Sequence, residues 1–101
     1  MSKKRFGARR ERQVRDSLVA AGWLVVRATG SLGFADLVAL KAGERPLMVE
    51  VKANAGSPFK NFPPERRREL VEAAEMAGAV AVLAHWPPRG KLQWIYSSEW
   101  P

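Results

Sequence analysis

Three apolar, strand-like runs follow one another between two helical stretches, and this order limits the possible folds more than any other feature of the chain. Residues 23–27, 34–40 and 46–53 are the three runs. Residues 6–21 and 64–77 instead repeat small or apolar side chains every three or four positions, which is the period of one helix face. Two more strand-like runs follow at 79–84 and 91–96. The order predicts one α/β domain over residues 1–101, with helices flanking a central mixed β-sheet.

Turn residues separate these elements in the expected places. Gly22 and Gly78 follow the two helical stretches as C-terminal caps, and Pro64 stands at the first position of the second helix. The turn between runs 34–40 and 46–53 is short, so these strands are predicted to form an antiparallel hairpin. Residues 1–5 are basic and are expected to form a flexible N-terminus.

The charge of the chain indicates a polyanionic partner. It has 17 Lys and Arg against 10 Asp and Glu, a net charge of +7, and residues 1–27 hold eight basic but only two acidic residues. Such a stripe is typical of contact with a phosphate backbone, although a solubilising basic tail is the alternative. Cysteine is absent, which excludes disulfides and a thiol nucleophile. No apolar run could span a bilayer or serve as a signal peptide, so we expect a cytoplasmic protein without membrane contact.

Four charged residues occupy positions that the apolar pattern assigns to the interior. Glu11 lies on the apolar stripe of the first helix, and Asp36 lies inside an apolar strand. Glu50 and Lys52 are two apart in another strand, so their side chains point to the same face. Buried charges are costly unless they are paired or bind a metal. One interpretation is a set of structural ion pairs, such as Glu50 with Lys52, but this leaves Glu11 and Asp36 unexplained.

The other interpretation is a divalent-metal site. Hard cations such as Mg²⁺ prefer carboxylate oxygens together with water and substrate phosphate. A lysine beside the metal could orient water or stabilise charge that develops on phosphorus. An acidic residue separated by one position from a lysine is common by chance. Asp36 on the adjacent strand makes the combination specific.

These residues resemble the signature of the PD-(D/E)XK nuclease superfamily, and more closely that of the archaeal-type Holliday junction resolvases, which also occur in phages. The resemblance covers roughly residues 5–85 and includes the element order. The segments that carry it are Arg9-Arg-Glu-Arg-Gln13, Val25-Val-Arg-Ala-Thr-Gly-Ser31, Ala35-Asp-Leu-Val-Ala39 and Val49-Glu-Val-Lys52.

The resemblance implies a restriction-endonuclease-like αβββαβ core and a set of site residues. Metal ligation falls on Glu11, Asp36, Glu50 and Val51, with Mg²⁺ as the cofactor and Mn²⁺ as a substitute. Lys52 would serve the attacking water. Two further residues are implied by matches to family positions: Ser31, needed for activity, and Arg27, close to the site.

Several basic residues are expected to contact DNA. The first helix offers Arg9, Arg10 and Arg12, which lie off its apolar stripe, and Arg27 ends the first strand-like run. Lys60, in a loop, and Arg67, at the start of the second helix, are further candidates, although residues 66–68 could instead be a solvated helix face.

Histidine and tryptophan receive less specific interpretations. The single histidine, His85, ends a buried strand and is expected to be structural. Trp86, Trp94 and Trp100 are expected in the core or in a dimer interface, and stacking on nucleic-acid bases is the alternative.

The sequence therefore predicts a Mg²⁺-dependent endonuclease that resolves four-way DNA junctions. A homodimer with two-fold symmetry would supply the paired nicks. Two alternatives remain: a less selective duplex or flap nuclease of the same superfamily, and a DNA-binding module that has lost catalysis.

Overall fold

The structure is a computed structural model that describes residues 3–28 and 34–101, with side chains in the first helix described from Phe6 on. Its elements follow the predicted order of helix, three strands, helix and two strands. They are α1 (Lys3–Ala20), β1 (Leu24–Arg27), β2 (Leu37–Leu40), β3 (Leu47–Lys52), α2 (Pro64–Ala77), β4 (Val80–His85), β5 (Gln93–Tyr96) and the short 3-10 helix η2 (Ser97–Glu99). No helix in this part of the chain has the length and apolar character needed to cross a membrane.

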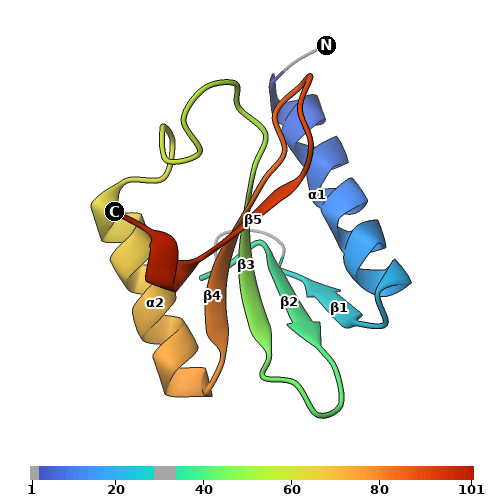
Figure 1. Ribbon diagram of the computed structural model, residues 1–101, viewed down its shortest axis with the longest axis vertical. Coiled ribbons are helices and arrows are strands. Elements are labelled where there is room, and N and C mark those ends of the chain that lie inside the picture. Colours follow the sequence, from blue (N-terminus) through green and yellow to red (C-terminus); the bar gives the residue numbers. More distant parts are fainter. Residues whose placement is uncertain (1–2, 29–33) are drawn as a thin grey trace.

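The five strands form one mixed sheet in the order β1-β2-β3-β4-β5. β1, β2 and β3 pair antiparallel, β3 and β4 pair parallel, and β5 returns antiparallel to β4. The predicted hairpin between the second and third strands is confirmed. Figure 1 shows α1 on one side of the sheet and α2 on the other, which is the predicted α/β arrangement with flanking helices.

Each helix covers a separate apolar core because side chains alternate between the two faces of every strand. The α1 core contains Val14, Leu18, Leu37, Ala39, Leu47, Val49, Val51, Val82 and Ala84. The α2 core contains Ala35, Phe62, Leu70, Ala74, Ala79, Ala81 and Leu83. The sheet thus has two faces with different partners, which we call the α1 face and the α2 face.

The ends of α2 are fixed as the sequence predicts. Pro64 is the first helical residue, and Gly78 caps the helix in the left-handed conformation with φ of 66°. A proline suits the first position because its missing N–H would have no partner within the helix, and a glycine accepts positive φ without steric conflict. The first and last turns of α2 are therefore set by the local sequence.

Two boundaries differ from the predictions by three residues. Helix α1 begins at Lys3, so part of the segment expected to be flexible is helical. Strand β2 begins at Leu37, so Asp36 lies immediately before the strand rather than inside it. The backbone of Asp36 still joins its neighbours, since its N–H donates to the Val49 carbonyl at 2.9 Å and its carbonyl accepts from the Ala28 N–H at 3.0 Å.

Candidate metal-binding and catalytic site

Strand β3 carries packing residues on one face and charged residues on the other. Val49 and Val51 point into the α1 core. Glu50 and Lys52 point to the α2 face, where Lys52 Nζ lies 3.2 Å from Glu50 Oε2. Glu50 is only 4% exposed. The prediction that these two charged side chains share one face is confirmed.

Asp36 reaches the same place from the neighbouring strand. The antiparallel register pairs Leu37 with Val49, so Asp36 comes beside Glu50. One Asp36 oxygen, Oδ2, accepts a hydrogen bond from the Val51 N–H at 2.8 Å. This bond fixes the direction of the Asp36 carboxylate.

Arg66 completes this group, and the sequence analysis did not single it out. Its Nη2 lies 3.2 Å from Glu50 Oε1 and also donates to the Phe34 carbonyl at 3.2 Å. Its Nη1 lies 3.6 Å from Glu69 Oε2 on the next turn of α2. Both oxygens of the Glu50 carboxylate therefore face a cation, one from β3 and one from α2.

Burial raises the pKa of both strand carboxyls. For Asp36, desolvation outweighs the Val51 hydrogen bond and the charges of Lys52 and Arg66, which lower the pKa. For Glu50, desolvation and the negative charge of Asp36 raise the pKa against the same two cations. The two carboxyls are therefore close enough to disfavour each other's ionised form, which a shared cation would relieve.

Glu11 approaches this pair from α1. Its pKa is raised first by partial burial and then by the charge of Asp36, while Arg27 lowers it. Arg27 Nη2 lies 3.7 Å from Glu11 Oε1. Glu11 thus lies within electrostatic range of Asp36, and Arg27 lies beside Glu11, although each is partly exposed.

The donor set suits a hard divalent cation in type. Asp36 and Glu50 offer carboxylate oxygens at one end of the sheet, Glu11 offers a third nearby, and Val51 has only its backbone carbonyl to offer. Within residues 3–28 and 34–101, however, no three carboxylate or imidazole side chains are gathered closely enough to hold a metal ion as they stand. Lys52 and Arg66 instead neutralise Glu50. The residues fit the metal, provided that Glu50 exchanges a cationic partner for it.

His85 and Asn54 border the site. His85 is directly paired with Lys52 in the parallel β3-β4 ladder, is 5% exposed, and donates from Nε2 to the Asn54 carbonyl at 2.8 Å. This bond ties the loop after β3 to the end of β4. The expectation of a structural histidine agrees with this contact.

The predicted DNA contacts divide into two groups. Arg9, Arg12 and Lys60 are exposed. Arg10, however, is only 8% exposed, and its guanidinium lies between the rings of Phe6 and Trp86. Its Nη2 also donates to the Pro87 carbonyl at 2.7 Å. The statement that Arg10 lies off the packed side of α1 is therefore wrong, because the 87–92 turn folds against that side.

Arg67 is likewise engaged within the chain. Its Nε donates to the Phe62 carbonyl at 2.8 Å, its Nη1 donates to the Pro101 carbonyl at 3.1 Å, and its guanidinium lies 5.0 Å from the centre of the Phe59 ring. Of the basic run at 66–68, Arg66 rather than Arg67 faces the site. Ser31, the predicted loop serine, lies outside the described residues.

The tryptophans belong to the chain's own packing. Trp86 and Trp94 pack against the α1 core. Trp100 packs edge-on against Phe62 at 5.1 Å between ring centres, and its indole N–H donates to the Ile95 carbonyl. These contacts agree with the core interpretation and leave a dimer interface without support from the aromatic side chains.

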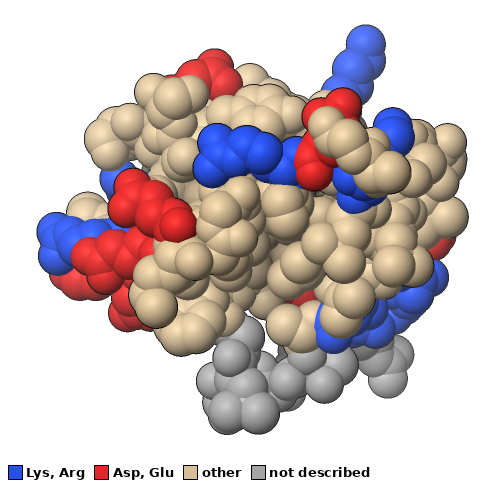
Figure 2. All heavy atoms as spheres, turned by 90° about the horizontal axis from the view of Figure 1, so that it is seen from below, with Lys and Arg blue, Asp and Glu red and all other residues tan. Residues whose placement is uncertain are grey.

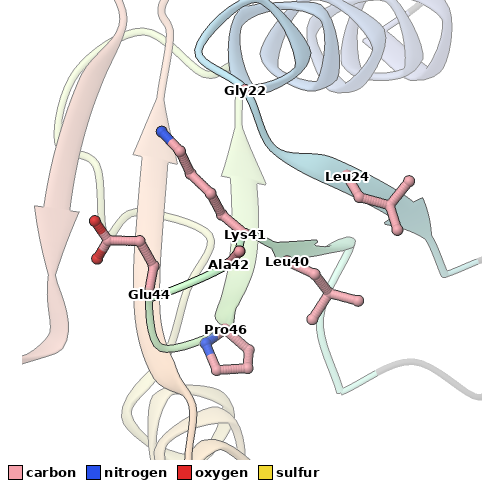
Figure 3. A pocket seen from close by; sticks show the side chains of 7 residues that line it. All are labelled: Gly22, Leu24, Leu40, Lys41, Ala42, Glu44 and Pro46. Carbon is pink, nitrogen blue, oxygen red and sulfur yellow. The ribbon is translucent and has the colours of Figure 1, made fainter.

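Two pockets lie at different positions relative to the candidate site. One lies at the opposite end of the sheet and is shown in Figure 3; Lys41 extends across it toward Gly22 and donates to the Ala21 carbonyl at 2.8 Å. It has a single carboxylate, Glu44, among its lining residues. The other opens beside Lys52, and Lys60 and Asn61 line it. Only the second adjoins the candidate site.

The surface charge is unevenly spread. Figure 2 shows the face seen from below in Figure 1: acidic side chains gather at its left, where α2 lies in Figure 1, and lysines and arginines form separate groups among uncharged residues. Among the described residues, the basic side chains on this face do not join into one surface.

Comparisons with known proteins show the family to which the chain is related. A family model described as archaeal Holliday junction resolvase (Hjc) matches residues 2–99. Among solved structures, Hjc of Archaeoglobus fulgidus, a Holliday junction resolvase from an archaeal hyperthermophile, is 29% identical, with a TM-score of 0.79. The match covers 91% of this chain and 78% of that chain. No curated protein sequence matches the chain.

Proposed function

The chain belongs to the archaeal Holliday junction resolvase family, and we propose that it is a Mg²⁺-dependent endonuclease that cuts four-way DNA junctions by paired nicks. The observation that supports the metal-dependent mechanism most is the meeting of Asp36, Glu50 and Lys52 at one point on the α2 face. In this proposal Asp36 and Glu50 hold the cation, with Glu11 and the Val51 carbonyl as further ligands. Mn²⁺ would replace Mg²⁺, because it accepts the same oxygen donors.

The bound cation would polarise the scissile phosphate and ease deprotonation of the attacking water. Lys52 has a different role. Its ammonium is held 3.2 Å from Glu50 Oε2 and 5.9 Å from the centre of the Phe62 ring, which is fully buried. A lysine positioned in this way can orient the water or stabilise the negative charge that develops on the phosphate oxygens.

The exposed basic residues would bind the DNA backbone. Arg9 and Arg12 lie on α1, Arg27 lies beside Glu11, and Lys60 lines the pocket next to Lys52. Ser31 remains a prediction from the family resemblance.

A homodimer would supply two sites related by two-fold symmetry, which suits the two opposed cuts that a junction requires. Exposed apolar side chains are available for such an interface at two places. Leu24, Val26 and Leu40 lie together on the β1-β2 part of the sheet, and Met76 on α2 is 91% exposed. Sedimentation should give twice the 11.2 kDa chain mass. A strict monomer would overturn the dimer.

Cleavage of a synthetic immobile four-way junction, beside linear duplex, flap and single strand of the same sequences, tests the function. We expect paired nicks near the branch point with Mg²⁺ or Mn²⁺, no cleavage in EDTA, and binding without turnover in Ca²⁺. Equal cleavage of linear duplex would favour a general nuclease of the superfamily. Junction binding without cleavage in any metal would favour an inactive DNA-binding module.

A further inference from the structure

Arg66 lies beside Glu50, where the proposed metal ion would bind. Its guanidinium contacts Glu50 Oε1 at 3.2 Å, and its charge also lowers the pKa of Asp36, so it lies close to both proposed ligands. Its side chain is 30% exposed, while that of Glu50 is 6% exposed. The guanidinium therefore covers the buried carboxylate from the solvent side.

Arg66 and Lys52 contact Glu50 from different elements of the fold. Lys52 is on the same strand as Glu50, two residues away, and moves with it. Arg66 reaches Glu50 from the first turn of α2, and its other partners are weak: a carbonyl of the exposed residue Phe34 and the exposed carboxylate of Glu69 at 3.6 Å. Of the two cations on Glu50, Arg66 is the one that can leave without distorting a strand.

We propose that Arg66 competes with the divalent cation for Glu50 Oε1 and, once displaced, binds the DNA phosphate at the site. The inference rests on the proposed function. A metal that takes Glu50 Oε1 removes the strongest partner of the guanidinium, which then remains at the mouth of the site with donors to spare. A phosphate brought there by the metal presents paired oxygens, and the planar fork of arginine matches them.

A purely structural ion pair makes different predictions. If Arg66 only compensated the charge of Glu50 in the folded protein, its removal would weaken the fold and leave metal affinity and turnover per folded molecule unchanged. If it competes with the metal, its removal must strengthen metal binding. If it also binds phosphate, the same substitution must slow cleavage even when the metal is saturating.

The first measurement is Mn²⁺ binding to the full chain without DNA, followed by electron paramagnetic resonance. We compare the unsubstituted protein with Arg66→Gln, Arg66→Lys and the matched control Arg68→Gln, which changes an exposed arginine of the same helix. Arg66→Gln should bind Mn²⁺ about fivefold more tightly, in line with the loss of one competing ion pair. Arg66→Lys and Arg68→Gln should remain near the unsubstituted protein.

The second measurement is junction cleavage at saturating Mn²⁺. Arg66→Gln should be slower by roughly 100-fold, the effect of removing one group that stabilises transition-state charge, with Arg66→Lys in between. Thermal unfolding identifies variants that fold. If Arg66→Gln does not fold, Arg66→Met, which also removes the charge, is used for both measurements.

The outcomes separate the inference from the proposed function. Unchanged Mn²⁺ affinity in folded Arg66→Gln overturns the competition, and unchanged cleavage at saturating metal overturns the phosphate contact. In both cases the metal-dependent nuclease stands. Absence of Mn²⁺ binding and of metal-dependent cleavage in the unsubstituted protein would instead remove the proposed function, and the inference with it.

Discussion

The two faces of the central sheet use the same strands for different purposes. On the α1 face, Val49 and Val51 of β3 are buried among aliphatic side chains from α1, β2 and β4. On the α2 face, Glu50 and Lys52 of the same strand meet Arg66 and Asp36. One residue along the strand separates packing from chemistry, because successive side chains point to opposite faces.

This difference shows how so small a domain can hold charges in its interior. The α1 face is apolar and gives the sheet a fixed register. The α2 face is apolar beneath α2, around Phe62, Leu70 and Leu83, and becomes polar toward the carboxyl ends of β3 and β4. The apolar packing on the α1 face thus keeps the strands in place around the charges on the α2 face. The burial of those charges is unfavourable for the fold by itself, as the raised pKa values of Asp36 and Glu50 indicate.

Substitutions at two adjacent positions of β3 should have the largest effects, one on cleavage and the other on stability. Glu50→Gln should lower cleavage by at least roughly 100-fold, because it removes a proposed metal ligand and leaves an amide that binds Mg²⁺ less well. Its unfolding temperature should hardly fall, since the substitution removes a charge whose burial is unfavourable. Val49→Ala should do the opposite and lose about 2 kcal/mol of stability through a cavity in the α1 core.

Cleavage rates per folded molecule and denaturant unfolding of both variants test this contrast. Val49→Ala should keep near-normal cleavage below its unfolding transition. Active Glu50→Gln, or a Val49→Ala variant that is folded but inactive, would show that the two faces are not separate in function.

The sequence predicts the parts of this division that depend on local periodicity. Alternation along 46–53 is enough to place Glu50 and Lys52 on one face, and the short turn after residue 40 is enough to bring Asp36 beside them. Glycine and proline positions predict both ends of α2. The same local signals support the order of elements, which the structure confirms.

Contacts across long sequence distances were not predictable in this way. The Arg66–Glu50 pair depends on the rotation of α2 above the sheet, and a run of three arginines gives no sign of which one faces inward. Arg10 is buried by a turn 77 residues further along the chain. Asp36 falls outside β2, since its carboxylate binds the Val51 N–H and the bend before the strand accommodates it.

Smaller effects, on stability and on DNA binding, are expected at α1, where neighbouring arginines have different roles. Arg10→Met removes a guanidinium that lies between two aromatic rings and donates to the Pro87 carbonyl, and should cost about 2 kcal/mol of stability. Arg12→Gln should leave stability unchanged and reduce the salt dependence of duplex binding by about 0.9 in the log–log slope, the value for one phosphate contact.

Thermal unfolding and binding measured over a range of salt concentrations distinguish these roles. The assignment of Arg10 to packing is wrong if Arg10→Met unfolds like the unsubstituted protein and instead lowers the salt dependence of DNA binding. In that case Arg10 would contact DNA, as the sequence first indicated.

The smallest expected effect is a pH dependence of the stability of the metal-free protein. It tests the charged residues on the α2 face directly. Burial raises the pKa of Asp36 above 3.8 and that of Glu50 above 4.5, while Lys52 and Arg66 oppose the shift. A carboxyl whose pKa is raised by folding adds stability below its unfolded pKa, and this stability is lost as pH rises through the folded value. Glu50→Gln should therefore gain stability relative to the unsubstituted protein between mildly acidic and neutral pH.

Denaturant unfolding of both proteins in EDTA over this pH range measures the difference in their stability. The contributions of surface groups that the two proteins share cancel in this difference. Val49→Ala is the control, since its deficit should not depend on pH. Added Mg²⁺ should reverse the trend in the unsubstituted protein and in Val49→Ala but not in Glu50→Gln, because the metal binds ionised carboxylates and stabilises the native state more as pH rises. A pH-independent difference in EDTA would mean that the cations on Glu50 fully compensate its burial and that the α2 face, like the α1 face, is built for stability.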